Sequence, residues 1–152
     1  MRKTDLAWTA GIIDGEGCIH IRKSQAYGAH LFPRYELNLS VRMCHEGTIR
    51  RLQALFGGTI FYEKGDETRL ERWNWSPCRT IGGEVLQKVK PYLVTKKLEA
   101  KAALEFLEIP NGRRGIKTPD SILALREKFY LQVRKLKFCK NNLFIRSPIP
   151  CG

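Results

Sequence analysis

Two neighbouring segments of the chain alternate between apolar and polar residues, and no other feature restricts the fold as strongly. Between Cys18 and Ser24, Ile19 and Ile21 alternate with His20 and Arg22. Between Arg34 and Met43, the apolar set is Tyr35, Leu37, Leu39, Val41 and Met43, and the polar set is Arg34, Glu36, Asn38, Ser40 and Arg42. Side chains of a strand point alternately to its two faces. The two segments therefore predict paired strands, joined by a hairpin tip over 25–34, with one apolar and one polar face.

Helical spacing and further strand patterns divide the rest of the chain. They predict helices over 5–14, 46–56, 83–93 and 96–107, a helix opened by Thr118-Pro119, and strands over 59–64 and 68–76 joined by the turn KGDE. The last helix carries an apolar stripe of Ile122, Leu125, Phe129, Val133 and Leu136. This order favours a single α+β domain with one four-stranded antiparallel sheet. We expect a core over 4–108 and a C-terminal helical extension over 109–152.

The chain is strongly basic. Its 152 residues hold 27 Lys and Arg against 15 Asp and Glu, which gives a net charge of +12 and a pI of 9.8. Such a balance favours a nucleic-acid partner or, less often, an anionic membrane surface. No basic amphipathic helix with an aromatic apolar face supports the membrane alternative, and no apolar run is long enough to span a bilayer. The N-terminal MRKTDLAW lacks the apolar stretch of a signal peptide, so we expect an intracellular protein, in a prokaryotic cytoplasm, an organelle or a nucleus.

Five scattered cysteines give no support for a disulfide framework or a zinc ribbon. None of them forms a C-x-x-C pair. Cys44-His45 and Cys18-x-His20 are the nearest approach to ligand pairs, and neither has the spacing of a zinc finger.

The stretch TAGIIDGEG, from Thr9 to Gly17, ends a predicted helix with two acids, Asp14 and Glu16. Acids are unfavourable at a helix C-terminus, because the helix dipole already concentrates negative charge there. The two acids are therefore either turn residues that follow the helix or ligands of a cation. The small residues Ala7, Ala10 and Gly11 of the same helix would allow another helix to approach closely.

The same nine residues resemble the LAGLIDADG motif of the homing endonucleases. The order of helices and strands, and KPYLVTKK at 90–97, are also similar to that family. The resemblance implies an αββαββα fold whose four-stranded sheet is a DNA-binding saddle in the major groove, here with extra C-terminal helices. One motif in the chain implies a homodimer on a long pseudo-palindromic site, with Ala7, Ala10 and Gly11 in the interface between the motif helices.

The resemblance further implies a sequence-specific double-strand DNA endonuclease, associated with an intron or an intein, that hydrolyses phosphodiesters with divalent metal ions. The metal ligands would be the Glu16 carboxylate and the Gly15 carbonyl. Many relatives have Asp where this chain has Glu16. Mg²⁺ is the expected ion, since it takes few protein carboxylates and shares phosphate oxygens and waters. Mn²⁺ is an alternative, and Ca²⁺ would bind without supporting cleavage.

Two further residues would complete the catalytic site. Asp14 would hold the helix end and orient its neighbours. Lys96 would lie near the scissile phosphate and stabilise developing charge or orient the attacking water. Lys97 is next to it, so the resemblance leaves open which of the two lysines has this role. The alternative is that Lys96 is an ordinary surface lysine at the N-terminus of a helix.

A departure from the family falls at the end of the second strand. Relatives often have Gln or another polar residue there to organise the water pocket, whereas this chain has Met43. Arg42, Arg50 or Arg51 would have to take over that role. The alternative for Arg50 and Arg51 is a solvated position on a helix face.

The polar strand face should read base edges. By alternation and by the geometry of the family, we predict DNA contacts for His20, Arg22, Ser24, Arg34, Glu36, Asn38, Ser40, Arg42, Tyr62, Lys64, Arg72 and Asn74. Trp73 and Trp75 are expected in the core.

Two rival functions use the same fold: an RNA-binding intron maturase and a DNA-binding regulator that does not cleave. Neither would require Glu16 and Lys96.

Overall fold

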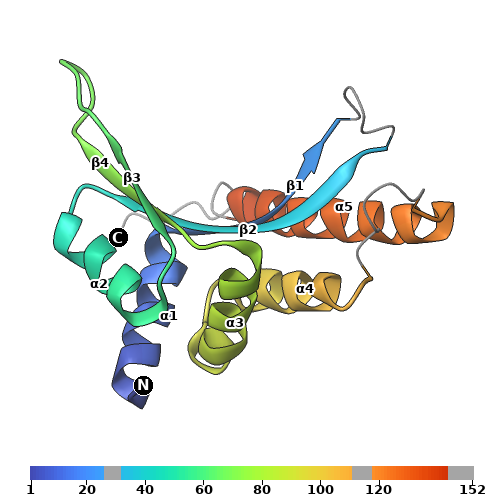
Figure 1. The fold of residues 1–152 in the computed structure, drawn as a ribbon, viewed down its shortest axis with the longest axis horizontal. Helices are drawn as coiled ribbons and strands as arrows, with labels where there is room; N and C mark the ends of the chain where they lie inside the picture. The colour runs from blue at the N-terminus through green and yellow to red at the C-terminus, as the bar shows by residue number, and fades with distance from the viewer. Residues whose placement is uncertain (26–31, 111–117, 144–152) are drawn as a thin grey trace, which may run out of the picture.

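The computed structural model describes residues 1–25, 32–110 and 118–143 (Figure 1). Its elements, in chain order, are α1 (Lys3–Glu16), β1 (Gly17–Ser24), β2 (Arg34–Met43), α2 (Glu46–Phe56), β3 (Thr59–Glu63), β4 (Arg72–Ser76), α3 (Arg79–Val89), the 3₁₀ turn η1 (Lys90–Tyr92), α4 (Lys97–Leu107) and α5 (Asp120–Leu143). The predicted element order and the α+β class are confirmed. Residues 26–31 of the hairpin tip predicted over 25–34, residues 111–117 and the tail over 144–152 lie outside the described residues.

The four strands form one antiparallel sheet in the order β1-β2-β4-β3. The β1–β2 register pairs Ile19 with Leu39 and Arg22 with Glu36, so apolar residues face apolar residues and polar face polar. Figure 1 shows a curved sheet with α1 to α4 gathered on one side and the other side open. Helix α5 packs beside the edge strand β1. The expected saddle with one polar, uncovered face is therefore present.

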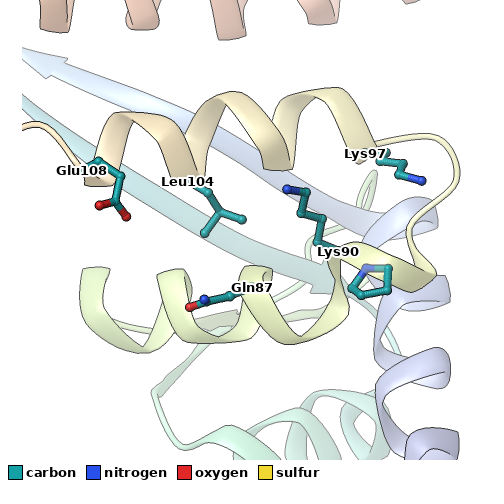
Figure 2. Close-up of a pocket in the computed structure, with 6 residues that line it drawn as sticks. Gln87, Lys90, Lys97, Leu104 and Glu108 are labelled. Carbon is teal, nitrogen blue, oxygen red and sulfur yellow. The ribbon is translucent and has the colours of Figure 1, made fainter.

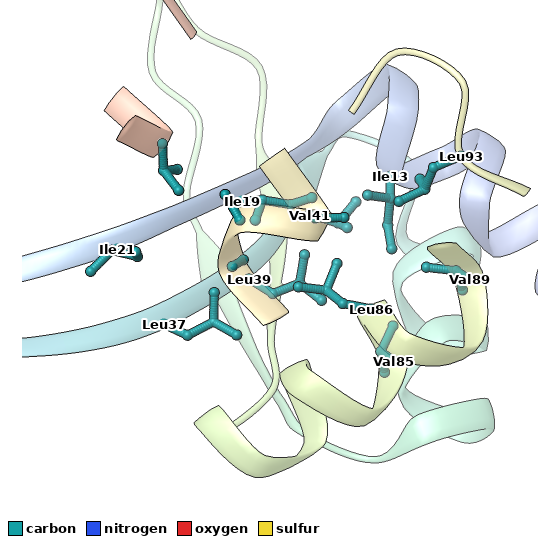
Figure 3. Close-up of a cluster of buried hydrophobic side chains, with 14 of the residues drawn as sticks. Ile13, Ile19, Ile21, Leu37, Leu39, Val41, Val85, Leu86, Val89 and Leu93 are labelled. Atoms are coloured by element: carbon teal, nitrogen blue, oxygen red, sulfur yellow. The ribbon is translucent and has the colours of Figure 1, made fainter. Parts of the chain in front are cut away.

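The core fills the space between the sheet and the helices beneath it (Figure 3). Ile13 of α1, Val41 of β2 and Leu86 and Val89 of α3 are fully buried there. Trp75, which was expected in the core, is also fully buried, and its indole N–H donates to the Gly57 carbonyl at 2.8 Å. This packing fixes the end of α1 against the middle of the sheet.

Among the described residues, no helix combines the length and the apolar character that a membrane crossing needs.

Helix α3 begins four residues earlier than predicted and ends before Pro91. The pair Gly82-Gly83 suggests a break, but both glycines are buried inside the helix. A Cβ on Gly83 would lie 2.6 Å from Leu107 Cδ1, so a larger residue there would have to displace the end of the Leu107 side chain where α3 meets α4. Pro91 cannot donate a backbone hydrogen bond, and the chain passes into the η1 turn around it.

Strand β4 is shorter than the predicted 68–76, because residues 66–69 form a tight turn instead. The Asp66 carboxylate accepts hydrogen bonds from the Thr68 backbone N–H at 2.9 Å and from its hydroxyl at 2.7 Å. A side chain that forms a hydrogen bond with the backbone two residues ahead favours a turn in preference to a strand. The strand resumes only at Arg72.

The apolar stripe predicted on α5 is wrong at Leu125, which is 39% exposed. Arg126 takes the buried position next to it and donates to the backbone carbonyls of Tyr35, Ile109 and Pro110. These three backbone acceptors engage both terminal nitrogens of the guanidinium and offset part of the cost of its burial. Arg126 thus joins α5 to strand β2 and to the chain that follows α4.

Candidate functional site

The candidate site lies at the C-terminal end of α1, where the chain passes directly from helix to strand. Helix α1 continues through Asp14 and Gly15 and ends at Glu16, so both acids belong to its last turn instead of following it. A Cβ on Gly17 would lie 2.6 Å from the Ile13 carbonyl oxygen. Glycine is therefore required at this junction, and it allows β1 to start immediately after Glu16.

Asp14 binds the segment before α4, eighty residues further along the chain. Its carboxylate accepts hydrogen bonds from the Val94 N–H at 2.7 Å, the Thr95 hydroxyl at 2.9 Å and the Lys96 N–H at 2.9 Å. Burial raises the pKa of the Asp14 carboxyl, but the hydrogen bonds from Val94, Lys96 and Thr95 outweigh burial and hold the pKa below its ordinary value. Asp14 is thus an ionised anchor for the 94–96 segment.

Lys96 extends from that segment onto the end of α1. Its ammonium group donates to the Ile13 carbonyl at 2.9 Å and to the Asp14 carbonyl. Both carbonyls lie in the last turn of α1, at the negative end of the helix dipole, so a lysine suits them. Lys97 instead lines a pocket between α3 and α4, together with Lys90 and Glu108 (Figure 2). Lys96 is therefore the lysine of this pair that reaches the end of α1.

Glu16 is exposed at the end of α1. In the described part of the chain, no hydrogen bond or ion pair engages its carboxylate. The Gly15 carbonyl belongs to the same exposed helix end. Carboxylate and carbonyl oxygens are the ligands that Mg²⁺ takes in proteins. Among the described residues, no three His, Cys, Asp or Glu side chains gather around a common point. The donors therefore fit an ion that completes its shell with waters and with oxygens from another molecule.

The arginines considered as substitutes for a polar residue at Met43 have other partners. Met43 pairs with Trp73 on the helix side of the sheet. Arg51 forms an ion pair with Asp5 at 3.1 Å and stacks on Trp8, at the opposite end of α1 from Glu16. Arg50 forms an ion pair with Glu46 along α2. Both arginines thus make the helix-surface contacts of the simpler alternative.

The sheet registers show which residues share the open face. Those predicted correctly to share it are His20, Arg22, Ser24, Arg34, Glu36, Asn38, Ser40, Arg42, Arg72 and Asn74. Two exposed ion pairs lie on it: Arg22–Glu36 at 2.8 Å and Arg42–Glu63 at 3.2 Å. We call this set the open sheet face; Cys18 of β1 and residues of β3, including Phe61 and Glu63, also belong to it. Whether its members contact DNA stays a prediction.

The prediction that Tyr62 shares this face is wrong. Tyr62 pairs with Trp73, with ring centroids 5.3 Å apart, on the helix side of the sheet. Lys64 lies beyond the end of β3, so the strand pairing places it on neither face. Thr59, Phe61 and Glu63 are the β3 residues on the open sheet face, opposite Ser76, Asn74 and Arg72. Sequence reasoning missed them because TIFYE lacks an apolar–polar alternation, so only the pairing of Ile60 with Trp75 sets the register.

The small residues predicted for a helix–helix interface divide between two sides of α1. Ala10 is fully buried in the core of its own chain, so its assignment to an interface between chains is wrong. Ala7 and Gly11 are exposed, one turn apart. A Cβ on Gly11 or on Gly15 would meet nothing within 4 Å. Val94, bonded to Asp14, is 82% exposed near the end of the same helix.

Cys18 begins the open sheet face, two residues after Glu16. Its sulfur lies 3.5 Å from His20 Nδ1 and accepts a hydrogen bond from the Lys137 ammonium of α5 at 3.0 Å. The contact with His20 lowers the pKa of the thiol most, burial opposes it and Lys137 adds to the lowering, which leaves the pKa at about 6. The C-terminal half of α5 thus brings a positive charge close to the start of β1.

No protein-family model and no curated protein matches the sequence. Solved structures do match the fold. The homing endonuclease I-CvuI, in complex with a DNA target in the presence of Mg²⁺, has a TM-score of 0.68 at 22% identity over 88% of this chain and 82% of its own. The archaeal intron-encoded homing endonuclease I-Vdi141I, complexed with DNA, has a TM-score of 0.55 at 14% identity, over 84% and 98%. The LAGLIDADG homing endonuclease I-GzeII, with its DNA target, has a TM-score of 0.66 at 11% identity, over 82% and 43%. The chain therefore has the fold of the LAGLIDADG homing endonucleases.

Proposed function

We propose that this chain is a LAGLIDADG homing endonuclease: a metal-dependent enzyme that cleaves double-stranded DNA at a specific site as an intracellular homodimer. The observation that carries the proposal is the convergence of Glu16 and Lys96 at the end of α1, beside a sheet face lined with arginines. A carboxylate, a lysine and a basic surface for the substrate are the groups that phosphodiester hydrolysis needs. The solved structures with this fold support the proposal, because they are endonucleases with DNA.

A divalent ion, Mg²⁺ or Mn²⁺, would supply charge stabilisation and an activated water at the scissile phosphate. Glu16 and the Gly15 carbonyl would hold it, since both are exposed oxygen donors at the negative end of a helix. Lys96 would place its positive charge near the phosphate that is cleaved. Asp14 would act indirectly, because its three hydrogen bonds position the segment that carries Lys96.

The open sheet face would lie against the major groove. Arg22, Arg34, Arg42 and Arg72 supply positive charge, while Asn38, Asn74 and Ser40 can donate and accept hydrogen bonds with base edges. The Arg22–Glu36 pair links the neighbouring strands β1 and β2, and the Arg42–Glu63 pair links β2 to β3 across β4. Their exposed acids can accept from cytosine amino groups.

A homodimer would complete the site. At the end of α1 one copy offers an ion the Glu16 carboxylate, and two copies related by a two-fold axis would bring two such carboxylates to neighbouring phosphates. The exposed Ala7 and Gly11 side of α1 has room for a second helix, and Val94 adds apolar surface beside it. A two-fold dimer would recognise a long, nearly palindromic site.

The test is cleavage of a plasmid library with randomised palindromic inserts in the presence of Mg²⁺, followed by sequencing of the cut ends. The matched control is Glu16→Gln, which keeps the shape of the side chain and removes its charge. We expect one long, nearly palindromic site that only the unchanged protein cuts, while both proteins bind it in Ca²⁺. Binding to RNA in preference to this library, with no cleavage under any divalent ion, would contradict the proposal and favour a maturase.

A further inference from the structure

One aromatic side chain lies on the otherwise polar open sheet face. Phe61 of β3 pairs with Asn74 of β4, which in turn pairs with Arg42 of β2, so the three residues form a row across three strands. Phe61 is 53% exposed. Its neighbour Glu63, on the same face, forms the ion pair with Arg42. Charged and amide groups therefore surround a benzyl group that faces outward.

The register holds Phe61 in this position. A shift of β3 by one residue would turn Phe61 toward the helices, but it would also move Ile60 away from the buried Trp75. The contact of Ile60 with the buried Trp75 thus determines the side to which Phe61 points, and the exposure of Phe61 follows from the packing of its neighbour.

A phenylalanine cannot read the hydrogen-bonding groups of base edges. In the major groove the apolar feature that distinguishes base pairs is the thymine 5-methyl group. The side chain opposite, Asn74, has the donor and the acceptor that suit adenine. Opposite residues of paired strands lie about 5 Å apart, comparable to the step of about 3.4 Å between successive bases of one strand. The pair can therefore address one base pair or two adjacent ones.

We propose that Phe61 determines specificity by packing on the 5-methyl group of a thymine in each half of the DNA site. This inference rests on the proposed endonuclease function and deepens it, because it names the chemical group that one residue recognises. It makes the site A·T-rich at the position of the row formed by Phe61, Asn74 and Arg42. Since uracil differs from thymine only by this methyl group, the contact can be removed from the DNA alone.

The test uses the cleavage site found with the library. Each thymine is replaced in turn by deoxyuridine, symmetrically in both half-sites, and DNA binding in Ca²⁺ is measured for the unchanged protein and for Phe61→Ala, Phe61→Leu and Tyr62→Ala. Tyr62→Ala is the matched control, because it removes the adjacent aromatic ring from the other face of the same strand. Loss of one buried methyl corresponds to about fourfold in affinity, so two half-sites give about sixteenfold.

We expect one thymine position at which deoxyuridine weakens binding of the unchanged protein by about this factor. Phe61→Ala should bind the thymine and deoxyuridine sites equally, whereas Phe61→Leu and Tyr62→Ala should still discriminate between them. Equal methyl discrimination by Phe61→Ala and the unchanged protein, or no discrimination at any position, would overturn the inference while leaving specific cleavage intact. Absence of any specific DNA site would overturn this inference and the proposed function together.

Discussion

Replacing Asp14 tests whether the end of α1 positions Lys96. Asp14→Ala removes the acceptor of three hydrogen bonds from Val94, Thr95 and Lys96 and leaves two backbone N–H groups without that partner. Hydrogen bonds to a charged group contribute about 1.5–3 kcal/mol each when they are shielded from water. The Asp14 carboxylate is partly exposed, so water replaces much of that energy, and we expect a loss of about 2 kcal/mol in total.

That loss should lower the midpoint of thermal unfolding by about 4–8 °C for a chain of this size. The larger effect should be on cleavage. When the 94–96 segment loses its anchor, Lys96 moves relative to Glu16, and a displacement of about 1 Å can reduce a rate by about a hundredfold. DNA affinity in Ca²⁺ should change little, because the open sheet face is untouched.

The assays are thermal and urea unfolding at neutral pH, single-turnover cleavage in Mg²⁺ and DNA binding in Ca²⁺. Glu105→Ala is a suitable control, since this acid lies exposed on α4 with only a loose ion pair to Lys101 at 3.8 Å. An Asp14→Ala protein with unchanged stability and cleavage would refute the positioning role. A parallel loss of DNA affinity and cleavage would instead indicate that the change has disturbed the whole fold.

Three further predictions follow from the same contacts. Lys96→Met should reduce single-turnover cleavage by about a hundredfold or more without a matching loss of DNA affinity, whereas Lys97→Met, at the pocket between α3 and α4, should cleave normally. Gly11→Leu should fold, because a Cβ there meets nothing within 4 Å in one chain, but sedimentation should show a monomer and cleavage should be lost; Ala124→Leu on the exposed side of α5 should stay a dimer. Hydrogen bonds from Lys23 and Tyr35 outweigh burial and lower the pKa of Glu127 below its ordinary 4.5, so this carboxylate stabilises the fold above that pH and loses its effect as the pH falls through the lower folded pKa. Glu127→Gln should therefore lower the free energy of unfolding by about 1 kcal/mol at pH 7 and by less at pH 3, as urea unfolding at the two pH values would show; an equal difference at both would contradict this origin.

The sequence predicts the fold best where a pattern extends over many residues. The alternation from Arg34 to Met43 covers a whole strand, and both the strand and its buried face are as predicted. In TIFYE the same reasoning fails, because Phe61 and Tyr62 are both aromatic and either could face the core. The choice depends on Ile60 meeting Trp75, a contact between strands that no local pattern contains.

Helix α1 shows a second limit. It is apolar almost all round, so its sequence cannot say which small residues face the core of its own chain. The structure assigns Ala10 to that core and leaves Gly11 exposed, although they are neighbours in the sequence. The contact of Asp14 with the 94–96 segment joins positions eighty residues apart. The resemblance to a family suggested Lys96, but no spacing in the chain reveals the bonds that position it.

The arrangement of the proposed site has a consequence for how the enzyme would be controlled. At the end of α1, one copy offers an ion the Glu16 carboxylate and the Gly15 carbonyl, so Mg²⁺ bound there would take its remaining ligands from water, from DNA and from a second copy. Lys96 is meanwhile bonded to helix carbonyls and needs a phosphate nearby to act on. Cleavage would therefore require a dimer, both half-sites and the ion together. At protein concentrations below the dimer dissociation constant, the rate should rise with the square of the protein concentration, whereas a chain that cleaves as a monomer would show a first-order dependence.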